Sequence, residues 1–165
     1  MNGPVFLKAA IRVPQLNASG GVRCRVEYGP EILSVAFTPW QKQPIRSLKQ
    51  ISVESIDYHA KFIDRTALNA LFSLRGNCDE IIIVKQDRIT DTSISNLIFF
   101  DGTAWITPTE PLLPGTCRER LLALRKISAR TLRPADLGSF SGVKLINALR
   151  DPDEEEMIPI SNIVS

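Results

Sequence analysis

Two short stretches of the sequence carry residue types that could hold a charged, ring-shaped molecule. The first, Asp91-Thr-Ser-Ile-Ser-Asn96, places an acid after one apolar strand and an asparagine before the next. The second, Leu112–Arg118, has a Pro-Gly turn before a predicted helix, whose first peptide N–H groups have no partner within the helix. Such a helix start carries a partial positive charge and suits a phosphate. An acid beside an anion site would suit a pyridine ring that carries a phosphate.

A third segment, Asn147-Ala-Leu149, extends this pattern. With it, the chain resembles the class IV aminotransferases, which are fold-type IV pyridoxal-phosphate (PLP) enzymes. They include D-amino acid aminotransferase, branched-chain aminotransferase and 4-amino-4-deoxychorismate lyase. The resemblance runs from about Val22 to Leu149, with order and spacing kept. It implies an α+β fold like that of D-amino acid aminotransferase, with a small α/β domain and a larger mixed-sheet pseudo-barrel domain, and it implies PLP as the cofactor.

The polar break between Pro39 and Pro44 is the expected domain boundary. We assign residues 1–43 to a partial small N-terminal domain, with a predicted hairpin, and residues 44–165 to the PLP-binding domain. Family members also carry a Glu-Thr strand signature and a His-x-x-Arg helix motif in the small domain. This sequence has neither, so the resemblance predicts a truncated small domain that lacks one charged contact to the cofactor phosphate.

The larger domain must position the polar residues on strands and helices. Its first predicted strand is Ile45–Ile56, and a helix capped by Asp64 should follow, with an apolar stripe that includes Ala67, Leu68 and Leu74. The other predicted elements are a meander of strands Glu80–Lys85, Arg88–Thr90, Leu97–Phe100 and Ala104–Thr107, a helix after Gly115, a short helix near 133–137, a last strand Val143–Leu149 and a solvated acidic run, Asp151–Glu156.

PLP needs an amine for its aldehyde, an acid for its ring nitrogen and donors for its phosphate. The resemblance assigns the amine to Lys61, because this residue aligns with the family lysine that precedes a helix containing arginine and asparagine, here Arg65 and Asn69. Once a substrate amine displaces it, Lys61 would act as a general base at the alpha carbon. Apart from the resemblance, Lys61 would be interpreted as a surface lysine, as most lysines are.

Asp91 is expected to face the pyridine nitrogen, where a carboxylate stabilises the protonated form. The family usually has glutamate here, so the shorter aspartate requires a closer ring or a bridging water. The structural alternative is an aspartate that caps a turn with Thr92 and Ser93. Ser95 and Asn96, in the same loop, either contact the cofactor or shape the loop.

In the resemblance, the turn and the helix that follows it hold the phosphate. Gly115, Thr116 and Cys117 would lie at the phosphate, with the backbone N–H groups of Thr116 and Cys117 as its donors. Leu113 would lie against one face of the ring, and Asn147 would lie near the phosphate. Each side chain also has a structural interpretation. Leu113 is then part of the core, and Asn147 satisfies a buried backbone group.

Three further residues are candidates for binding the substrate. Arg23 and Arg25 share one face of the early strand, and paired guanidinium groups suit a carboxylate, although an exposed strand face explains them equally. Tyr58, together with His59, lies close to Lys61 in the sequence and either lines the site or packs in the core.

Composition excludes several other classes of protein. The chain is 44% hydrophobic and carries a net charge of +2 from interspersed residues, which indicates a globular protein without a nucleic-acid footprint. No apolar run approaches the ~20 residues of a membrane span, and no signal peptide is evident, so we expect a cytoplasmic protein without a membrane partner. Three widely spaced cysteines and one histidine argue against disulfides and against a metal site.

The sequence therefore predicts a PLP-dependent enzyme that acts on a small, amino-acid-like substrate. Asn147-Ala-Leu149 and the short chain favour the 4-amino-4-deoxychorismate lyase branch. A branched-chain or D-amino acid aminotransferase would use the same residues, and a non-catalytic, truncated remnant of the family is a third alternative. Because the family's sites lie near a dimer interface, the resemblance also implies a homodimer.

Overall fold

The computed structural model describes residues 11–12, 21–56, 58, 61 and 63–165, and the chain forms two compact units that divide after Gln43. In the first unit, strands β1 (Gly21–Tyr28) and β2 (Ile32–Trp40) form an antiparallel hairpin. The hairpin predicted for this part of the chain is thus confirmed.

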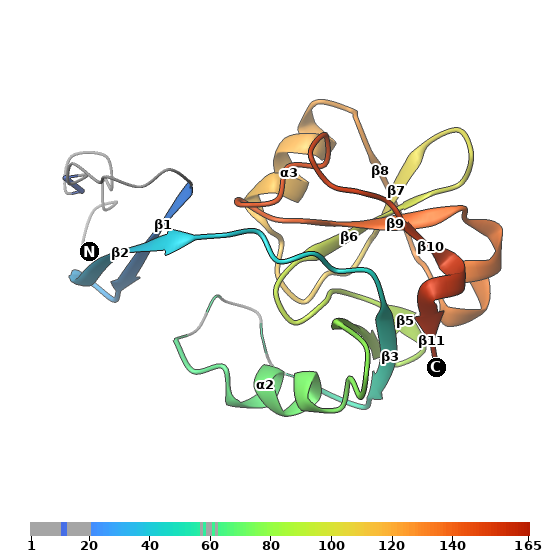
Figure 1. Ribbon diagram of the computed structural model, residues 1–165, viewed down its shortest axis with the longest axis horizontal. Helices are drawn as coiled ribbons and strands as arrows, with labels where there is room; N and C mark the ends of the chain where they lie inside the picture. Colours follow the sequence, from blue (N-terminus) through green and yellow to red (C-terminus); the bar gives the residue numbers. More distant parts are fainter. Residues whose placement is uncertain (1–10, 13–20, 57, 59–60, 62) are drawn as a thin grey trace. The chain divides into compact units, whose positions relative to one another are not determined.

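The second unit, Pro44–Ser165, contains a four-stranded sheet in the order β11-β3-β4-β5 (Figure 1). Its strands are β3 (Leu48–Val53), β4 (Glu80–Lys85), β5 (Arg88–Ile89) and β11 (Ile163–Val164). Because β3 and β4 are parallel, the chain must cross over between them, and helix α2 (Thr66–Ser73) lies in that connection. The segment that contains Lys61 therefore leads from the end of β3 into α2.

A five-stranded sheet, in the order β10-β9-β6-β7-β8, forms the other half of this unit. Its strands are β6 (Asn96–Phe100), β7 (Trp105–Pro108), β8 (Ser128–Arg130), β9 (Gly142–Ile146) and β10 (Ile158–Pro159). Strands β7 and β8 are parallel, and helix α3 (Thr116–Ala123) lies in the crossover between them. Two short 3-10 helices, Pro134–Ser139 and Ile160–Asn162, complete the unit.

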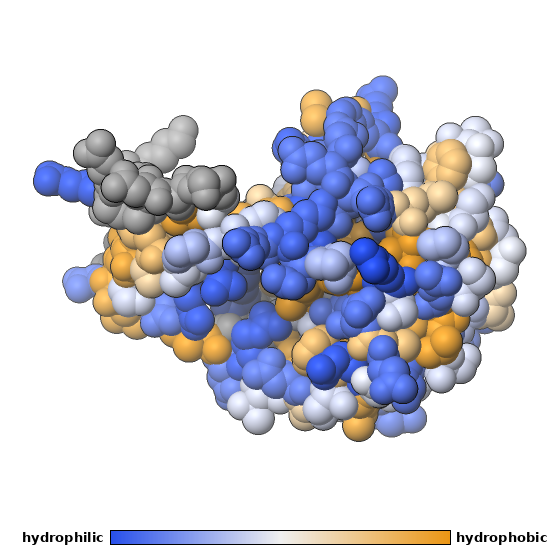
Figure 2. Space-filling view, in the orientation of Figure 1, coloured by the Kyte–Doolittle hydropathy of each residue, from blue (hydrophilic) through white to orange (hydrophobic). Residues whose placement is uncertain are grey.

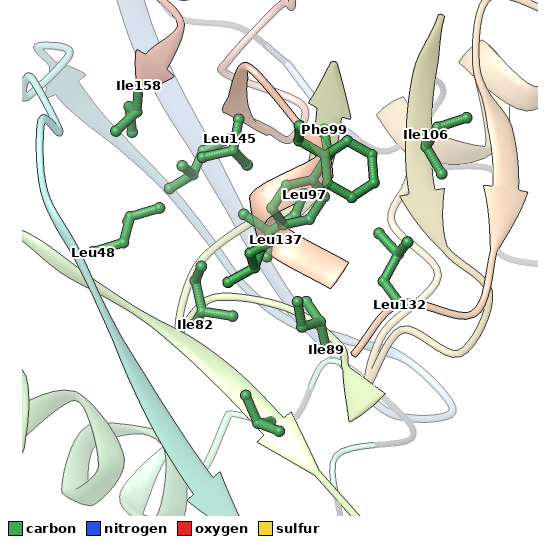
Figure 3. Packing of buried hydrophobic residues seen from close by; sticks show 13 residues of the cluster. Leu48, Ile82, Ile89, Leu97, Phe99, Ile106, Leu132, Leu137, Leu145 and Ile158 are labelled. Atoms are coloured by element: carbon green, nitrogen blue, oxygen red, sulfur yellow. The ribbon is translucent and has the colours of Figure 1, made fainter. Parts of the chain in front are cut away.

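The main core lies between the two sheets, and each helix covers an outer face. Ile82 of β4 and Leu97 and Phe99 of β6 belong to one buried cluster (Figure 3). Their neighbours point the opposite way, since successive strand residues alternate: Ile81 packs with Leu68 of α2, and Ile98 packs with Leu121 of α3. Strands buried on both faces are apolar throughout, which explains the run of isoleucines in β4. The face seen in Figure 2 carries both hydrophilic and hydrophobic residues.

Several sequence expectations about these elements were wrong. The predicted meander is split, because β4 and β5 belong to one sheet and β6 and β7 to the other. Helix α2 begins after Arg65, although the Asp64 carboxylate still accepts a hydrogen bond from the Thr66 N–H, and Ala67 is exposed. Only Leu68 of α2 is fully buried, so the predicted stripe is narrower than expected.

The C-terminal part of the chain also differs from the prediction. Strand β9 ends at Ile146, before Leu149, and two further short strands follow it. Within the predicted solvated acidic run, Glu155 is nearly buried and its carboxylate lies 2.9 Å from a guanidinium nitrogen of Arg150. A charged residue type alone predicts exposure to solvent, and Glu155 is an exception because the buried Arg150 guanidinium lies beside it.

Candidate active site

A cavity of about 250 Å³ collects most of the polar residues that the sequence singled out. It is lined by residues 91–96, residues 112–116, Tyr58, Lys61, Arg65, Leu68, Asn147 and Ala148. Lys61 and Asp91, 30 positions apart in the chain, thus face one small volume. Helix α2 and the loop before it supply one wall of the cavity, and the start of α3 supplies another.

The hairpin of β4 and β5 brings Asp91 to the cavity, because the chain stays hydrogen-bonded to β4 for two residues beyond the end of β5. Gln86 and Asp87 form its tight turn with positive φ angles of 50° and 59°, and the Ile83 N–H still donates to the Asp91 carbonyl at 2.8 Å. The Asp91 side chain is buried, with one carboxylate oxygen accepting from the Asn96 amide at 2.7 Å and the other from the Leu113 N–H at 3.0 Å. Burial outweighs these hydrogen bonds and raises the pKa of Asp91 from 3.8 to about 6.

Asn96 ties Asp91 to the turn before α3. Its amide nitrogen also donates to the Leu113 carbonyl at 2.8 Å, and its amide oxygen accepts from the Gly115 N–H at 3.2 Å. Of the two roles that the sequence left open for Asn96, the hydrogen bonds support shaping the loop. A Cβ atom on Gly115 would lie only 2.2 Å from the Asn96 oxygen, so this position requires glycine for close approach.

We expect Gly115→Ala to destabilise the protein by about 1–3 kcal/mol, because the added methyl group must displace the Asn96 amide and its hydrogen bonds. Urea denaturation monitored by circular dichroism measures this change. Gly138→Ala is the matched control, since no atom lies within 4 Å of its ideal Cβ position. Equal stability of the two variants would contradict the role assigned to the Asn96–Gly115 contact.

The start of α3 offers free backbone donors at the cavity. Gly115 is the extended residue before the helix, and no side chain caps the first turn. The N–H groups of Thr116 and Cys117 therefore have the character of an anion site. The Cys117 side chain does not line the cavity: it is buried with Ile98 and Leu121 on the other side of the helix, so only its backbone is available.

Ser95 and Asn147 contact each other in the cavity wall. The Asn147 amide donates to the Ser95 hydroxyl at 2.9 Å and to the Ile94 carbonyl at 3.2 Å. The second bond ties Asn147 to a backbone carbonyl of the loop, at an exposed position and not at the buried one that the structural interpretation expected. Both residues also line the cavity, so a role beside a ligand is compatible with these contacts.

A polar cluster that sequence reasoning missed supports the same loop. The buried Glu80 carboxylate accepts a hydrogen bond from the Ser93 hydroxyl at 2.9 Å, and burial raises the pKa of Glu80. Arg65 donates from its guanidinium to the Ser93 carbonyl at 2.6 Å and itself lines the cavity. The signal in the sequence was an acid at the start of an apolar strand, which needs a nearby partner when it is buried.

The remaining candidates have simple placements. Leu113 lines the cavity and packs against the core cluster under α2, so both of its expected positions are compatible with the structure. Tyr58 lines the cavity and is buried, while Lys61 is exposed at its edge. Arg23 and Arg25 lie on β1 in the first unit, where Arg25 forms an ion pair with Glu27 at 2.8 Å. His59 lies outside the described residues.

The described residues contain no group of three or more His, Cys, Asp or Glu residues arranged to hold a metal ion. None of their helices has the length and apolar character needed to cross a membrane.

Comparison with known proteins decides the family. The sequence profile described as amino-transferase class IV matches residues 15–163. The chain belongs to the class IV aminotransferase family. Its α+β architecture is therefore the fold-type IV, D-amino acid aminotransferase-like fold that the sequence predicted, and its cavity lies in the larger unit of that fold.

Three individual proteins show how similar this class IV chain is to members of its family and fold. A Haemophilus somnus 129pt protein, provisionally named 4-amino-4-deoxychorismate lyase, is 42% identical with a TM-score of 0.78; the match covers 81% of this chain and 69% of that protein. An uncharacterized protein of Haemophilus influenzae is 40% identical, over 87% of this chain and 76% of its own length. A hypothetical aminotransferase of Mycobacterium tuberculosis, solved in a PLP-bound form, is 17% identical with a TM-score of 0.63, over 78% and 53% of the two chains, and shows the common fold.

Proposed function

We propose that this chain binds PLP in the 250 Å³ cavity and acts as a 4-amino-4-deoxychorismate lyase. The observation that carries the proposal is the shared cavity, in which an amine, a buried acid and a helix start face one volume. The lyase assignment is supported by the 42% identity to the Haemophilus somnus protein. A cytoplasmic homodimer is part of the same proposal.

The residues of the cavity fit PLP chemically. Asp91 can accept a further hydrogen bond from a ring N–H, since its two carboxylate oxygens have four lone pairs and the donors Asn96, Leu113 and Leu112 use at most three of them. The uncapped N–H groups at the start of α3 suit the phosphate. Gly115 has no side chain, so a ligand can lie close to its backbone. The nearby Asn96 side chain excludes any larger residue at this position.

Each residue would have a separate task. When bound, PLP supplies an electron sink for the carbon that carries the substrate amine. Lys61 anchors the cofactor and then receives the proton from that carbon as a general base. Asp91 holds the proton of the ring nitrogen in place. In the lyase reaction, loss of the enolpyruvyl group as pyruvate leaves the aromatic product 4-aminobenzoate.

A product assay tests this proposal. Purified protein with added PLP is given 4-amino-4-deoxychorismate, and pyruvate and 4-aminobenzoate are measured. Parallel reactions contain amino acids and a keto acid. Formation of both lyase products supports the proposal, whereas keto-acid-dependent amino transfer without them would assign an aminotransferase. Borohydride reduction followed by peptide mapping identifies the lysine that holds the cofactor, and absence of any labelled peptide with Lys61 would favour a non-catalytic member of the family.

A further inference from the structure

A second cavity, of about 340 Å³, adjoins the first. Its lining consists of Ile56, Tyr58, Lys85, Gln86, Arg88, Thr90, Glu110, Pro111 and Leu112. Tyr58 and Leu112 line both cavities, so the two volumes are neighbours. Thr90 lines the second cavity, and the next residue, Asp91, lines the first.

The charge in the second cavity is positive among the described residues. Arg88 is paired with Glu110, and both side chains are largely exposed. Lys85, at the end of β4, is half-buried, and its ammonium makes one long hydrogen bond of 3.4 Å to the Ile56 carbonyl. No acid of the described part of the chain lies within ion-pair distance of Lys85. An ammonium group has three donors, so Lys85 retains donors for an anion.

We propose that the second cavity binds a carboxylate of the substrate that lies away from the reacting amine, with Lys85 as its cation. This inference rests on the proposed function and specifies its substrate class. The amine end of the substrate lies beside Lys61 in the first cavity, and an acidic arm passes Tyr58 and Leu112 to reach Lys85. The preferred substrates are therefore amines with two carboxylates, such as 4-amino-4-deoxychorismate, and not the apolar amino acids.

This anion site is distinct from the one expected for the cofactor phosphate. Gly115 and Thr116, at the start of α3, line only the first cavity, and Lys85 lines only the second. Removal of the Lys85 charge should therefore weaken binding of a dicarboxylate and leave PLP binding unchanged.

Substitution of Glu110 should change the affinity for a dicarboxylate in the direction opposite to substitution of Lys85. The Glu110 carboxylate forms an ion pair with the Arg88 guanidinium. Removal of the carboxylate charge would leave this guanidinium available to bind an anionic ligand. Lys85→Met and Glu110→Gln should thus change dicarboxylate affinity with opposite signs. Because Glu110 is exposed and surface ion pairs contribute little to stability, Glu110→Gln should fold normally.

The experiment uses chorismate as the probe, because it has two carboxylates and a hydroxyl group in place of the substrate amine. Isothermal titration of the PLP-saturated protein gives its Kd for the original chain, Lys85→Met, Lys85→Arg, Glu110→Gln and Lys49→Met. Lys49, a half-buried lysine of β3 that lines neither cavity, is the matched control. We expect Lys85→Met to raise the Kd about 10-fold or more, Glu110→Gln to lower it several-fold, and Lys85→Arg and Lys49→Met to change it less than about threefold.

Two outcomes would overturn the inference: no chorismate binding at millimolar concentration, or a Kd that Lys85→Met and Glu110→Gln leave within twofold of the original. These results are separable from failure of the proposed function, which is measured by the lyase assay and by borohydride labelling of Lys61. A chain that binds chorismate through Lys85 but releases no pyruvate keeps the anion site and loses the lyase assignment.

Discussion

Replacement of Lys61 by alanine should abolish cofactor attachment and lower lyase turnover at least about 1,000-fold. The amine is proposed to serve twice, first as the covalent anchor of PLP and then as the base at the reacting carbon, and general bases alone contribute roughly 100- to 10,000-fold. Turnover is measured by pyruvate release, and attachment by borohydride reduction and peptide mapping. Since Lys61 is exposed, its removal should leave the unfolding transition unchanged.

Two controls separate this role from a general loss of positive charge. Lys49→Ala removes a lysine of the same unit that lines neither cavity, and it should retain attachment and turnover. Addition of methylamine to the Lys61→Ala variant should restore a small part of the turnover, because a free amine can replace the missing base. Full activity of Lys61→Ala, or labelling of another lysine in the original chain, would remove Lys61 from the catalytic role.

The strands that alternate or are wholly apolar could be predicted from the sequence. Strand β4 was located to the residue, and β6 to within one residue, because both are apolar runs that end at turns. The split into two sheets could not be predicted. The split depends on which strands pair with each other. It also depends on the loop from β5 to β6, where residues without a periodic pattern form hydrogen bonds such as that between Thr92 and Ser95.

Strands of two or three residues, such as β8 and β10, are too short for hydrophobic periodicity to indicate them. They form because neighbouring strands offer unpaired edges, which is a property of the folded chain. The buried pair of Arg150 and Glu155 was missed for a similar reason. Charge alone predicts exposure, and only the packing of the C-terminal segment removes both groups from water.

For the candidate site, the resemblance predicted which residues are involved, and the structure shows how these residues contact one another. The common cavity of Lys61 and Asp91 follows from the crossover before α2 and from the tight hairpin after β4. The contacts that hold Asp91 in place could not be derived from spacing, because the Leu113 N–H comes from a turn 22 positions further along the chain and the Asn96 amide bonds to the same turn. The sequence does not single out Lys85, because its proposed role depends on a second cavity that the sequence does not reveal.

Replacement of Asp91 by asparagine should lower lyase turnover about 100- to 1,000-fold, the usual cost of removing a preorganised electrostatic partner. A carboxylate can hold the ring nitrogen in its protonated form, and a neutral amide cannot. PLP should still attach to Lys61 in this variant, so borohydride labelling is the control that separates loss of chemistry from loss of the cofactor. Turnover within threefold of the original would assign Asp91 the structural role of a turn cap.

The same variant should change how stability depends on pH in the protein without PLP. Because burial raises the pKa of Asp91 from 3.8 to about 6, the folded protein holds a proton between these values that the unfolded chain has released. The free energy of unfolding should therefore fall as pH rises through this window, by up to ~3 kcal/mol at ~1.4 kcal/mol per pKa unit. Glu80, whose pKa is also raised by burial, contributes to the slope with the same sign.

Urea denaturation between pH 4 and pH 7, in the original chain and in Asp91→Asn, measures the contribution of Asp91 as the difference between the two slopes. Saturating PLP should reduce that slope in the original chain, because the ring N–H favours the ionised carboxylate and lowers its pKa toward the ordinary value. The affinity for PLP should correspondingly weaken below pH 6, where Asp91 becomes protonated. Identical slopes with and without PLP would place the ring nitrogen away from Asp91, even if the cofactor is attached to Lys61.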